Sequence, residues 1–391
     1  MKRYQGNSDT LLVLHSATLG GPTSSAINLL RLLREAGRPI DVFLMDHDGP
    51  RTADLAAEGN LLPRDPFLAD AITGKQNVRS AAQYLRRGGY VLSHKLLGAK
   101  RARARLFARA AKRLGSAYKN VIAYQESVTT DFVRYIDTPN RIGWMHTDFD
   151  RLRALAPSSA SRETYDAYHH IASVTKASAD RMIEVLSRDP ETVHVIRNPL
   201  IAASLVERSR EEIPAEEARS KPLALVSVGR LSPEKAFVRI PRVASKLKAA
   251  GVDFEWTIIG DGTTRGEIER EIAATETGDV VRLLGARMNP YPYVRVADLL
   301  VITSEYEAQP MVANEALILD TPVLSTEFAS VREVIKDGAN GMIVAQSEDA
   351  IAEAILSFVG DEVLRATLAK GAADFRYSNE GELAAITALL S

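Results

Sequence analysis

The sequence contains no cysteine, no long apolar run, and no acidic residue between Asp70 and Glu126. Without cysteine the chain can form neither a disulfide bond nor a thiolate metal site, which fits a cytoplasmic protein. The apolar run at residues 11–14 is too short for the hydrophobic core of a signal peptide. No segment approaches the roughly 18 apolar residues of a membrane-spanning helix. We therefore expect a protein that is neither secreted through a signal peptide nor integral to a membrane.

The composition is that of a globular protein with more than one core. The chain has 391 residues, of which 46% are hydrophobic and 25% are charged, and its formal net charge is −1. Short apolar runs, typical of buried strands, alternate with helical patterns in both halves of the chain, which predicts two separate parallel sheets. The polar segment 207–221 is expected to link them.

Basic residues are concentrated in the segment that lacks acidic ones. The lysines and arginines of this basic block are Lys75, Arg79, Arg86, Arg87, Lys95, Lys100, Arg101, Arg103, Arg105, Arg109, Lys112, Arg113 and Lys119. Arg101, Arg105, Arg109 and Lys112 have the spacing of one helical face. Such a face can simply be solvated, but the one-sided charge favours an anionic membrane surface or a polyanionic acceptor as the partner of residues 75–119. Nucleic acid is not expected, because no aromatic ladder accompanies the charges.

Residues 304–317 carry the strongest functional signal. They follow the apolar run 299–302, which is typical of a strand buried on both faces. Pro310 fits the first turn of a helix, where no backbone N–H is needed. Glu307 then falls in the loop and Glu315 in the helix. Because a helix N-terminus presents free N–H groups and a positive dipole end to an anion, we expect a diphosphate here, with the two glutamates binding hydroxyl groups on either side.

Two glutamates separated by seven residues after such a strand resemble the signature of the retaining glycosyltransferases of family 4, which have the two-domain GT-B fold. Further matching segments are residues 226–235, 258–262, 281–285, 289–293, 322–326 and 337–341. The resemblance implies an α/β GT-B fold, with two Rossmann-like domains whose parallel sheets face an interdomain cleft. It implies an acceptor-side domain over residues 1–200, a nucleotide-sugar-binding domain over 201–375, and a C-terminal helix over 376–391 that returns to the first domain.

The resemblance also implies roles for charged residues of the second domain. Arg230 and Lys235 match the cations that hold the donor diphosphate, where they would stabilise the charge on the leaving phosphate. They would replace a metal, so neither a metal nor another cofactor is expected. Glu307 matches the glutamate that contacts the sugar near the reacting carbon, and Glu315 the one that binds the ribose. The other expected donor contacts are Gly229, Gly262, Arg287 and the backbone amides of Gln309, Met311 and Val312.

The first half resembles the family less closely. Gly20 and Gly21 begin an amphipathic helix, and such a glycine pair lets backbone N–H groups approach the donor phosphate or the acceptor. His146 lies in a segment that resembles the strand end carrying the family's first-domain histidine, which contacts the sugar or the acceptor. Together with residues 121–127, this segment resembles enzymes that build bacterial surface polysaccharides.

The resemblance therefore implies an enzyme that moves a sugar from a nucleotide-diphosphate donor to a glycan, wall-polymer or lipid-linked acceptor. The implied mechanism is retaining, metal-independent and front-face, in a cytoplasmic enzyme that is peripheral at the inner face of the cell membrane. The sequence departs from the family at Ala308-Gln309-Pro310, where Gly-Phe-Gly is common, and at Ala236, where glycine commonly follows the lysine. The base, donor sugar, acceptor and oligomeric state stay open.

Other functions fit less of the chain. Asp46-His47-Asp48 and Asp148-Phe149-Asp150 have the Asp-x-Asp spacing of metal-dependent glycosyltransferases, but neither explains the second half. A dehydrogenase is disfavoured because residues 260–266 lack the third glycine of a dinucleotide-binding turn. A phosphorylase or an epimerase shares the architecture without this combination of motifs. A non-catalytic glycosyltransferase-like partner, binding a polymer or protein through the basic block, is the main alternative.

Overall fold

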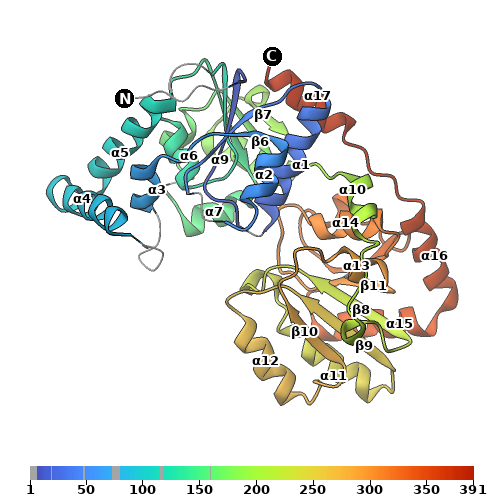
Figure 1. Ribbon diagram of the computed structural model, residues 1–391. Helices are drawn as coiled ribbons and strands as arrows, with labels where there is room; N and C mark the ends of the chain where they lie inside the picture. Colours follow the sequence, from blue (N-terminus) through green and yellow to red (C-terminus); the bar gives the residue numbers. More distant parts are fainter. Residues whose placement is uncertain (1–6, 19, 47–48, 73–79, 115–117, 159) are drawn as a thin grey trace. The chain divides into compact units, whose positions relative to one another are not determined.

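The computed structural model describes residues 7–18, 20–46, 49–72, 80–114, 118–158 and 160–391. The chain forms two compact units (Figure 1). Unit 1 consists of Met1–Pro199 and Asn379–Ser391, and unit 2 of Leu200–Ser378. The sequence placed these boundaries after residues 200 and 375. No helix in the described ranges is both long and apolar enough to cross a membrane.

Unit 1 is built on seven parallel strands in the order β3-β2-β1-β4-β5-β6-β7. The strands are β1 (Thr10–Leu14), β2 (Asp41–Leu44), β3 (Asn60–Leu61), β4 (Asn120–Ala123), β5 (Asn140–Met145), β6 (His170–Ser173) and β7 (Val193–Val195). All five residues of β1 are buried, as expected for a central strand of a parallel sheet. The strand order reverses between β1 and β4, so the ends of these two strands form the switch point at which α/β sheets bind ligands.

The sheet of unit 1 is accompanied by ten helices within the described residues. They are α1 (Gly21–Glu35), α2 (Thr52–Glu58), α3 (Pro66–Ile72), α4 (Ala81–Leu97), α5 (Ala99–Leu114), α6 (Val128–Val133), α7 (Phe149–Leu155), α8 (Arg162–Tyr165), α9 (Lys176–Leu186) and α17 (Glu380–Leu389). Figure 1 shows α4 and α5 beside α3 at one edge of the unit. Gly98, with a φ of 78°, makes the sharp turn between α4 and α5 that a residue with a Cβ adopts only at a cost.

The C-terminal helix α17 belongs to unit 1, as the fold prediction required. The side-chain amides of Asn120 and Asn140 donate hydrogen bonds to the carbonyls of Leu390 (3.1 Å) and Leu389 (2.8 Å). Because Asn120 begins β4 and Asn140 begins β5, these bonds fix the end of the chain at the amino edge of the sheet. The predicted return of the last helix to the first domain is confirmed.

Unit 2 has six parallel strands in the order β10-β9-β8-β11-β12-β13. The strands are β8 (Leu223–Val228), β9 (Phe254–Ile259), β10 (Val281–Gly285), β11 (Leu299–Ile302), β12 (Val323–Thr326) and β13 (Gly341–Val344). The helices are α10 (Ala202–Arg208), α11 (Arg239–Ala249), α12 (Arg265–Ala274), α13 (Tyr291–Arg295), α14 (Met311–Ile318), α15 (Glu348–Gly360) and α16 (Glu362–Ala373). The switch point of this sheet lies between β8 and β11.

Candidate functional site

The loops that follow β8 and β9 are in direct backbone contact at the carboxyl edge of the unit 2 sheet. The Gly229 N–H donates to the Ile259 carbonyl at 3.0 Å. A Cβ on Gly262 would lie 2.2 Å from the Leu231 carbonyl oxygen, and one on Gly260 would lie 1.8 Å from that of Gly229. Glycine at position 262 is therefore required by packing alone, and its contact with a donor stays a prediction.

The structure brings Lys235 and Glu307 together at the switch point. Lys235 follows β8, Glu307 follows β11, and the Lys235 Nζ lies 2.9 Å from the Glu307 Oε1. The Ser304 hydroxyl donates to the same oxygen at 2.7 Å. The Thr303 hydroxyl donates to the Lys235 carbonyl at 2.7 Å, which ties the two loops together. Because the Glu307 side chain is only 7% exposed, this cation and carboxylate form a largely buried ion pair rather than a solvent-exposed one.

Arg230 lies beside this pair in sequence but differs from it in its surroundings. It is exposed and forms no ion pair with any described residue, so its guanidinium is available to an anion. A planar guanidinium binds two phosphate oxygens at once, whereas the ammonium of Lys235 acts as a point charge. The two cations thus offer different contacts to one diphosphate.

Glu315 lies in α14 and is partly buried. The Tyr291 hydroxyl donates to its Oε1 at 3.4 Å. Burial raises the pKa of the Glu315 carboxyl to about 7, while Tyr291, Arg208 and Lys235 act in the opposite direction. Arg208 stacks over the Tyr291 ring at 4.8 Å. Neither Tyr291 nor Arg208 was assigned a role from the sequence, because their contact with Glu315 joins α10, α13 and α14 across long sequence distances.

The start of α14 differs from the prediction by one residue, and one expected donor amide already has a partner. Helix α14 begins at Met311, with Pro310 as its N-cap residue rather than within its first turn. The Met311 N–H already donates to the Gln309 carbonyl at 2.8 Å, so this amide is not available to a phosphate as it stands. The Val312 N–H lies in the first helical turn, where backbone donors have no partner within the helix.

Arg287 is also engaged, through its side chain. Its guanidinium forms an ion pair with Glu217, which also accepts a hydrogen bond from the Tyr293 hydroxyl. Tyr293 first and Arg287 second lower the pKa of the Glu217 carboxyl. A donor contact at Arg287 would thus use its backbone, or would require this ion pair to open.

In unit 1 the glycine pair lies at the switch-point end of β1. Gly20 is the N-cap residue of α1 and has a φ of 146°, a backbone conformation that favours glycine. Gly21 begins the helix, and a Cβ there would meet no atom within 4 Å. The backbone of this turn is therefore open to an approaching ligand, and which ligand it binds stays a prediction.

His146 directly follows β5 and contacts Tyr124 and Trp144. Its ring lies edge-on to Tyr124, with centroids 4.6 Å apart, and nearly parallel to Trp144, with centroids 6.3 Å apart. Both ring nitrogens are buried without a hydrogen bond of normal geometry among the described residues. Burial lowers the pKa of His146 to about 4, against weaker opposing effects of the Tyr124 carbonyl and the Asn198 side chain. The imidazole is therefore neutral at pH 7.

A half-buried carboxylate positions the backbone at His146. The Glu126 Oε1 accepts hydrogen bonds from the N–H groups of His146 and Thr147, the second at 2.6 Å. Burial raises the pKa of Glu126, and these backbone donors counteract it. Glu126 follows β4 and His146 follows β5, so the bonds join two neighbouring strand ends. The sequence places Glu126 in a segment that resembles the family but implies no role for its side chain.

Residues 209–375 match the family model described as Glycosyl transferases group 1. Unit 2 is a group 1 glycosyltransferase domain. The matched region contains Arg230, Lys235, Glu307 and Glu315, and it extends over nearly all of unit 2. The predicted enzyme class, a glycosyltransferase, is confirmed at the level of this group 1 domain.

Two curated relatives are similar to about half of the chain. Alpha-D-kanosaminyltransferase of Streptomyces kanamyceticus is 25% identical over 236 residues, which cover 58% of this chain and 60% of the relative. The N-acetylgalactosamine-N,N'-diacetylbacillosaminyl-diphospho-undecaprenol 4-alpha-N-acetylgalactosaminyltransferase of Campylobacter jejuni is 24% identical over 193 residues, 49% of this chain and 51% of the relative. The chain thus spans between about half and three fifths of the length of these relatives.

A solved structure extends the similarity to both units. The crystal structure of HepE from Anabaena, in complex with UDP and glucose, matches 98% of this chain and 99% of its own, with a TM-score of 0.72 and 15% sequence identity. At this identity the likeness shows the fold alone. The predicted GT-B fold, with two Rossmann-like domains on parallel sheets, is confirmed.

The candidate metal motifs have other partners or lie partly outside the described residues. His47 and Asp48, in the first motif, are outside them. In the second motif, Asp148 caps α7 by accepting from the Arg151 N–H, and Asp150 pairs with Arg181 at 2.8 Å. Among the residues that the structure describes, no group of three or more histidine, aspartate and glutamate side chains could hold a metal ion.

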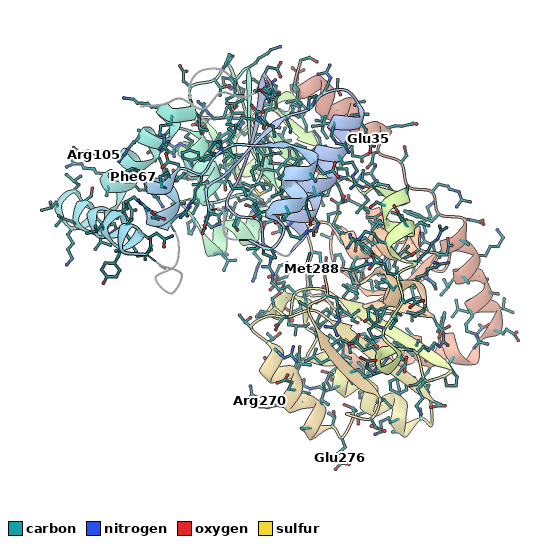
Figure 2. All side chains as sticks on the ribbon, in the orientation of Figure 1. Glu35, Phe67, Arg105, Arg270, Glu276 and Met288 are labelled. Carbon is teal, nitrogen blue, oxygen red and sulfur yellow. The ribbon has the colours of Figure 1, made fainter. Side chains whose placement is uncertain are left out.

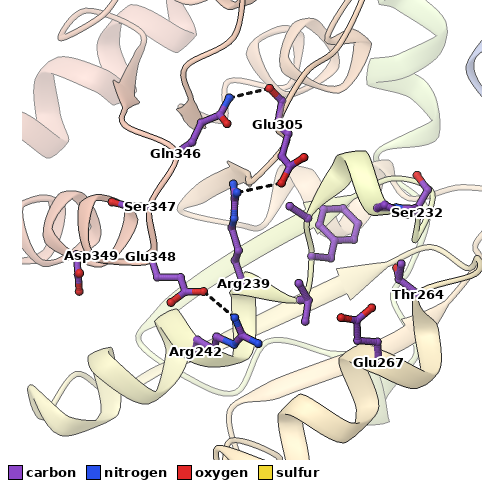
Figure 3. Close-up of a pocket in the computed structure, with 14 residues that line it drawn as sticks. Ser232, Arg239, Arg242, Thr264, Glu267, Glu305, Gln346, Ser347, Glu348 and Asp349 are labelled. Carbon is purple, nitrogen blue, oxygen red and sulfur yellow. Dashed lines mark hydrogen bonds and ion pairs between the residues drawn. The ribbon is translucent and has the colours of Figure 1, made fainter. Parts of the chain in front are cut away.

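A separate pocket of about 530 Å³ lies within the group 1 domain (Figure 3). Arg239 pairs with Glu305 at 3.2 Å, Gln346 donates to the Glu305 carbonyl at 2.7 Å, and Arg242 pairs with Glu348 at 3.2 Å. None of the donor-site residues predicted from the sequence lines this pocket. Its charged groups are largely paired with one another, so we do not assign the donor to it.

The basic block forms α4 and α5, apart from Lys75 and Arg79, which lie outside the described residues, and Lys119. Four exposed cations of α5, Arg101, Arg105, Arg109 and Lys112, form no ion pair with a described residue, whereas the exposed Lys100 lies 3.9 Å from Glu163. Figure 2 shows Arg105 on the outer side of the helix. Other members are neutralised by acids from outside the block: Arg86 by Asp70, Arg103 by Asp131 and Arg113 by Asp65. The positive surface is therefore narrower than the sequence predicted.

Proposed function

We propose that this protein is a retaining glycosyltransferase that moves a sugar from a nucleotide-diphosphate donor to a cell-surface glycan, wall polymer or lipid-linked acceptor. The observation that carries the proposal is the pairing of Lys235 with Glu307 at the switch point of the group 1 domain, 2.9 Å apart. Glu315 lies on the helix that begins just beyond this pair. A cation and two carboxylates at this place match the needs of a charged leaving group flanked by sugar and ribose hydroxyls.

The donor diphosphate would be bound by Arg230, Lys235 and the N-terminus of α14. Breaking the bond to the anomeric carbon places negative charge on the leaving phosphate, which fixed cations stabilise more strongly in the transition state than in the ground state. Glu315 would accept hydrogen bonds from the ribose, and Glu307 from the sugar. In this proposal no metal and no other cofactor takes part.

The proposed mechanism is a front-face transfer rather than a double displacement. Glu307 would be a poor nucleophile, because its Oε1 contacts both Lys235 and the Ser304 hydroxyl. The leaving phosphate would then help to deprotonate the acceptor on the same face of the sugar. His146 would act as a neutral hydrogen-bonding group toward the sugar or the acceptor, since its pKa is lowered to about 4.

The name of one relative and the HepE complex support the substrate classes. One relative transfers a sugar to a diphospho-undecaprenol-linked acceptor, and HepE binds UDP. By this likeness we propose a lipid-linked or polymeric acceptor and a protein located in the cytoplasm, peripheral at the inner face of the membrane.

Thermal-shift measurements with nucleotide diphosphates test the proposed function. We expect one of UDP, GDP, ADP or dTDP to raise the melting temperature, because a ligand that binds only the folded state stabilises it by RT ln(1 + [L]/Kd), about 2.7 kcal/mol at 100 times Kd. The variant Glu315→Ala should lose most of the shift. Absence of any shift, together with no release of nucleotide from the matching sugar nucleotides, would favour the non-catalytic alternative.

Removing divalent metals should leave the transfer rate unchanged. The reason is that Arg230 and Lys235 supply the positive charge at the leaving phosphate. The rate of nucleotide release from the sugar donor is measured in roughly 5 to 10 mM EDTA and compared with the rate in Mg²⁺ or Mn²⁺. Loss of activity in EDTA and recovery with either metal would contradict the metal-independent mechanism.

A further inference from the structure

Helix α4 turns an apolar face outward. None of its residues is buried, although it contains several large apolar side chains. The exposed ones are Tyr84 (69%), Leu85 (76%), Val91 (45%), Leu92 (57%) and Leu96 (75%). At 100° per residue these side chains fall on one side of the helix, together with Lys95. Contiguous exposed apolar surface of this kind marks an interaction site in a folded protein.

The opposite side of α4 accounts for how the helix is held. It contacts α3 and α5, and Arg86 on this side pairs with the buried Asp70 of α3. The Ser80 side chain caps the start of α4 by accepting from the Gln83 N–H at 3.2 Å, and Gly98 ends it. The helix is thus fixed through its polar side, and the apolar side is left to solvent.

The surroundings of this apolar face are cationic. Lys95 lies within it, and Arg101 and Arg105 are exposed next along the chain without an ion pair to a described residue, while Lys100 is exposed but lies 3.9 Å from Glu163. No aspartate or glutamate occurs from residue 71 to residue 125. An interfacial helix binds an anionic membrane through two features. Its exposed apolar side chains insert below the headgroups, and its lysines and arginines are attracted to the headgroups.

We propose that the outer face of α4 inserts into the interfacial region of an anionic lipid bilayer, with the cations of α5 at the headgroups. This deepens the proposed function, since it places the enzyme at the membrane, but it rests on the exposed residues of unit 1 and not on the donor site. The basic block alone is compatible with an anionic membrane or a polyanionic acceptor. The exposed leucines favour the membrane, because a polyanionic acceptor would not bind apolar side chains.

A second copy of this chain fits the same surface poorly. In a symmetric dimer formed through α4, Lys95 and the cations of α5 would face their own copies across the interface, and no acidic residue of the segment could pair with them. Anionic headgroups remove that repulsion. The charge pattern therefore selects the bilayer over self-association.

The test measures flotation of the full-length protein with phosphatidylcholine vesicles that do or do not contain about a third phosphatidylglycerol. The face variant is Leu85→Gln, Leu92→Gln and Leu96→Gln together; glutamine keeps the helix, and each of these leucines is more than half exposed, so little packing is lost. It should bind the anionic vesicles roughly tenfold or more weakly than wild type. The charge variant, with Arg101, Arg105, Arg109 and Lys112 replaced by glutamine, should lose binding to the same degree. Neutral vesicles should bind wild type weakly.

Matched controls separate this face from exposed apolar residues in general. Leu155 and Val363 are 69% and 76% exposed on other helices, so Leu155→Gln with Val363→Gln should bind vesicles as wild type does. A Leu92→Trp reporter should show a blue shift of its fluorescence on anionic vesicles. The two native tryptophans, Trp144 and Trp256, are buried at 3% and 0% exposure and give a constant background.

Three outcomes would overturn the proposal. The face variant could bind vesicles as well as wild type. Light scattering could show wild type to be an oligomer that the face variant disrupts, without vesicle binding by either, which would make the face a protein interface. Wild type could bind soluble dextran sulfate but no vesicle, which would assign the surface to a polyanionic acceptor. The nucleotide-induced thermal shift is measured in parallel, so that failure of the donor site is distinguished from failure of the membrane surface.

Discussion

Replacing Lys235 by alanine should lower the rate of sugar transfer by about 100- to 1,000-fold. Removing one fixed group that stabilises developing charge in an active site costs roughly this factor. The substitution would also leave the Glu307 carboxylate, 7% exposed, without the cation that lies 2.9 Å away. The measurement is the rate of nucleotide release with saturating sugar donor. The matched control is Lys248→Ala in the same domain, where the lysine pairs with Asp279 at the surface and its loss should be nearly silent.

The double variant tests whether Lys235 and Glu307 act as a unit. Glu307→Gln alone should reduce turnover more than nucleotide affinity, because Glu307 is proposed to contact the sugar and not the nucleotide. If the two residues act together, their effects on the transition-state free energy are not additive. The sum of the effects of Lys235→Ala and Glu307→Gln should then clearly exceed the effect of the double variant. Activity of Lys235→Ala within threefold of wild type would remove this lysine from the mechanism.

Replacing Glu315 by alanine should weaken nucleotide binding by about 10- to 100-fold. A hydrogen bond to a charged group contributes roughly 1.5–3 kcal/mol, and Glu315 is proposed to accept such bonds from the ribose. Calorimetry with the nucleotide found by thermal shift measures the effect. Glu305→Ala is the control, since Glu305 is an exposed glutamate of the preceding loop that pairs with Arg239. Equal nucleotide affinity of wild type and Glu315→Ala would rule out the ribose contact.

Because of Glu315, the stability of the protein and its affinity for nucleotide should depend on pH in opposite directions. Burial raises the pKa of Glu315 from 4.5 to about 7, so the folded protein holds this proton more tightly than the unfolded chain does. The contribution of Glu315 to the free energy of unfolding is fully present below pH 4.5 and is lost as the pH rises to about 7. Over this range the free energy of unfolding falls by up to about 1.4 kcal/mol per pH unit. Nucleotide affinity should instead increase through pH 7, because the ionised carboxylate is the better acceptor. Glu315→Gln should flatten both trends, as measured by urea unfolding and by calorimetry between pH 5 and pH 8.

The sequence was most informative where chemistry depends on short spacing. The apolar run at 299–302 and the proline at 310 predicted a buried strand followed by a helix, and the structure has β11 and α14 there. Glu307 therefore fell in the loop and Glu315 in the helix, as expected. The donor contact at the Met311 amide stays a prediction, and the sequence did not anticipate that this amide is bonded to the Gln309 carbonyl, because that bond depends on the conformation of a loop that the residue types leave open.

What the sequence by itself determined is the two-unit α/β plan, the family resemblance and the identities of the charged residues near the switch point of unit 2. These follow from local periodicity and from motifs a few residues long. Only the tertiary structure decided which groups pair: Lys235 with Glu307, Tyr291 with Glu315, and Glu126 with the backbone at His146. It also decided that α4 exposes its leucines, which periodicity alone would have assigned to a core. The physical reason is that burial, pairing and pKa depend on contacts between segments distant in the chain, and such contacts exist only once the sheets and helices have packed.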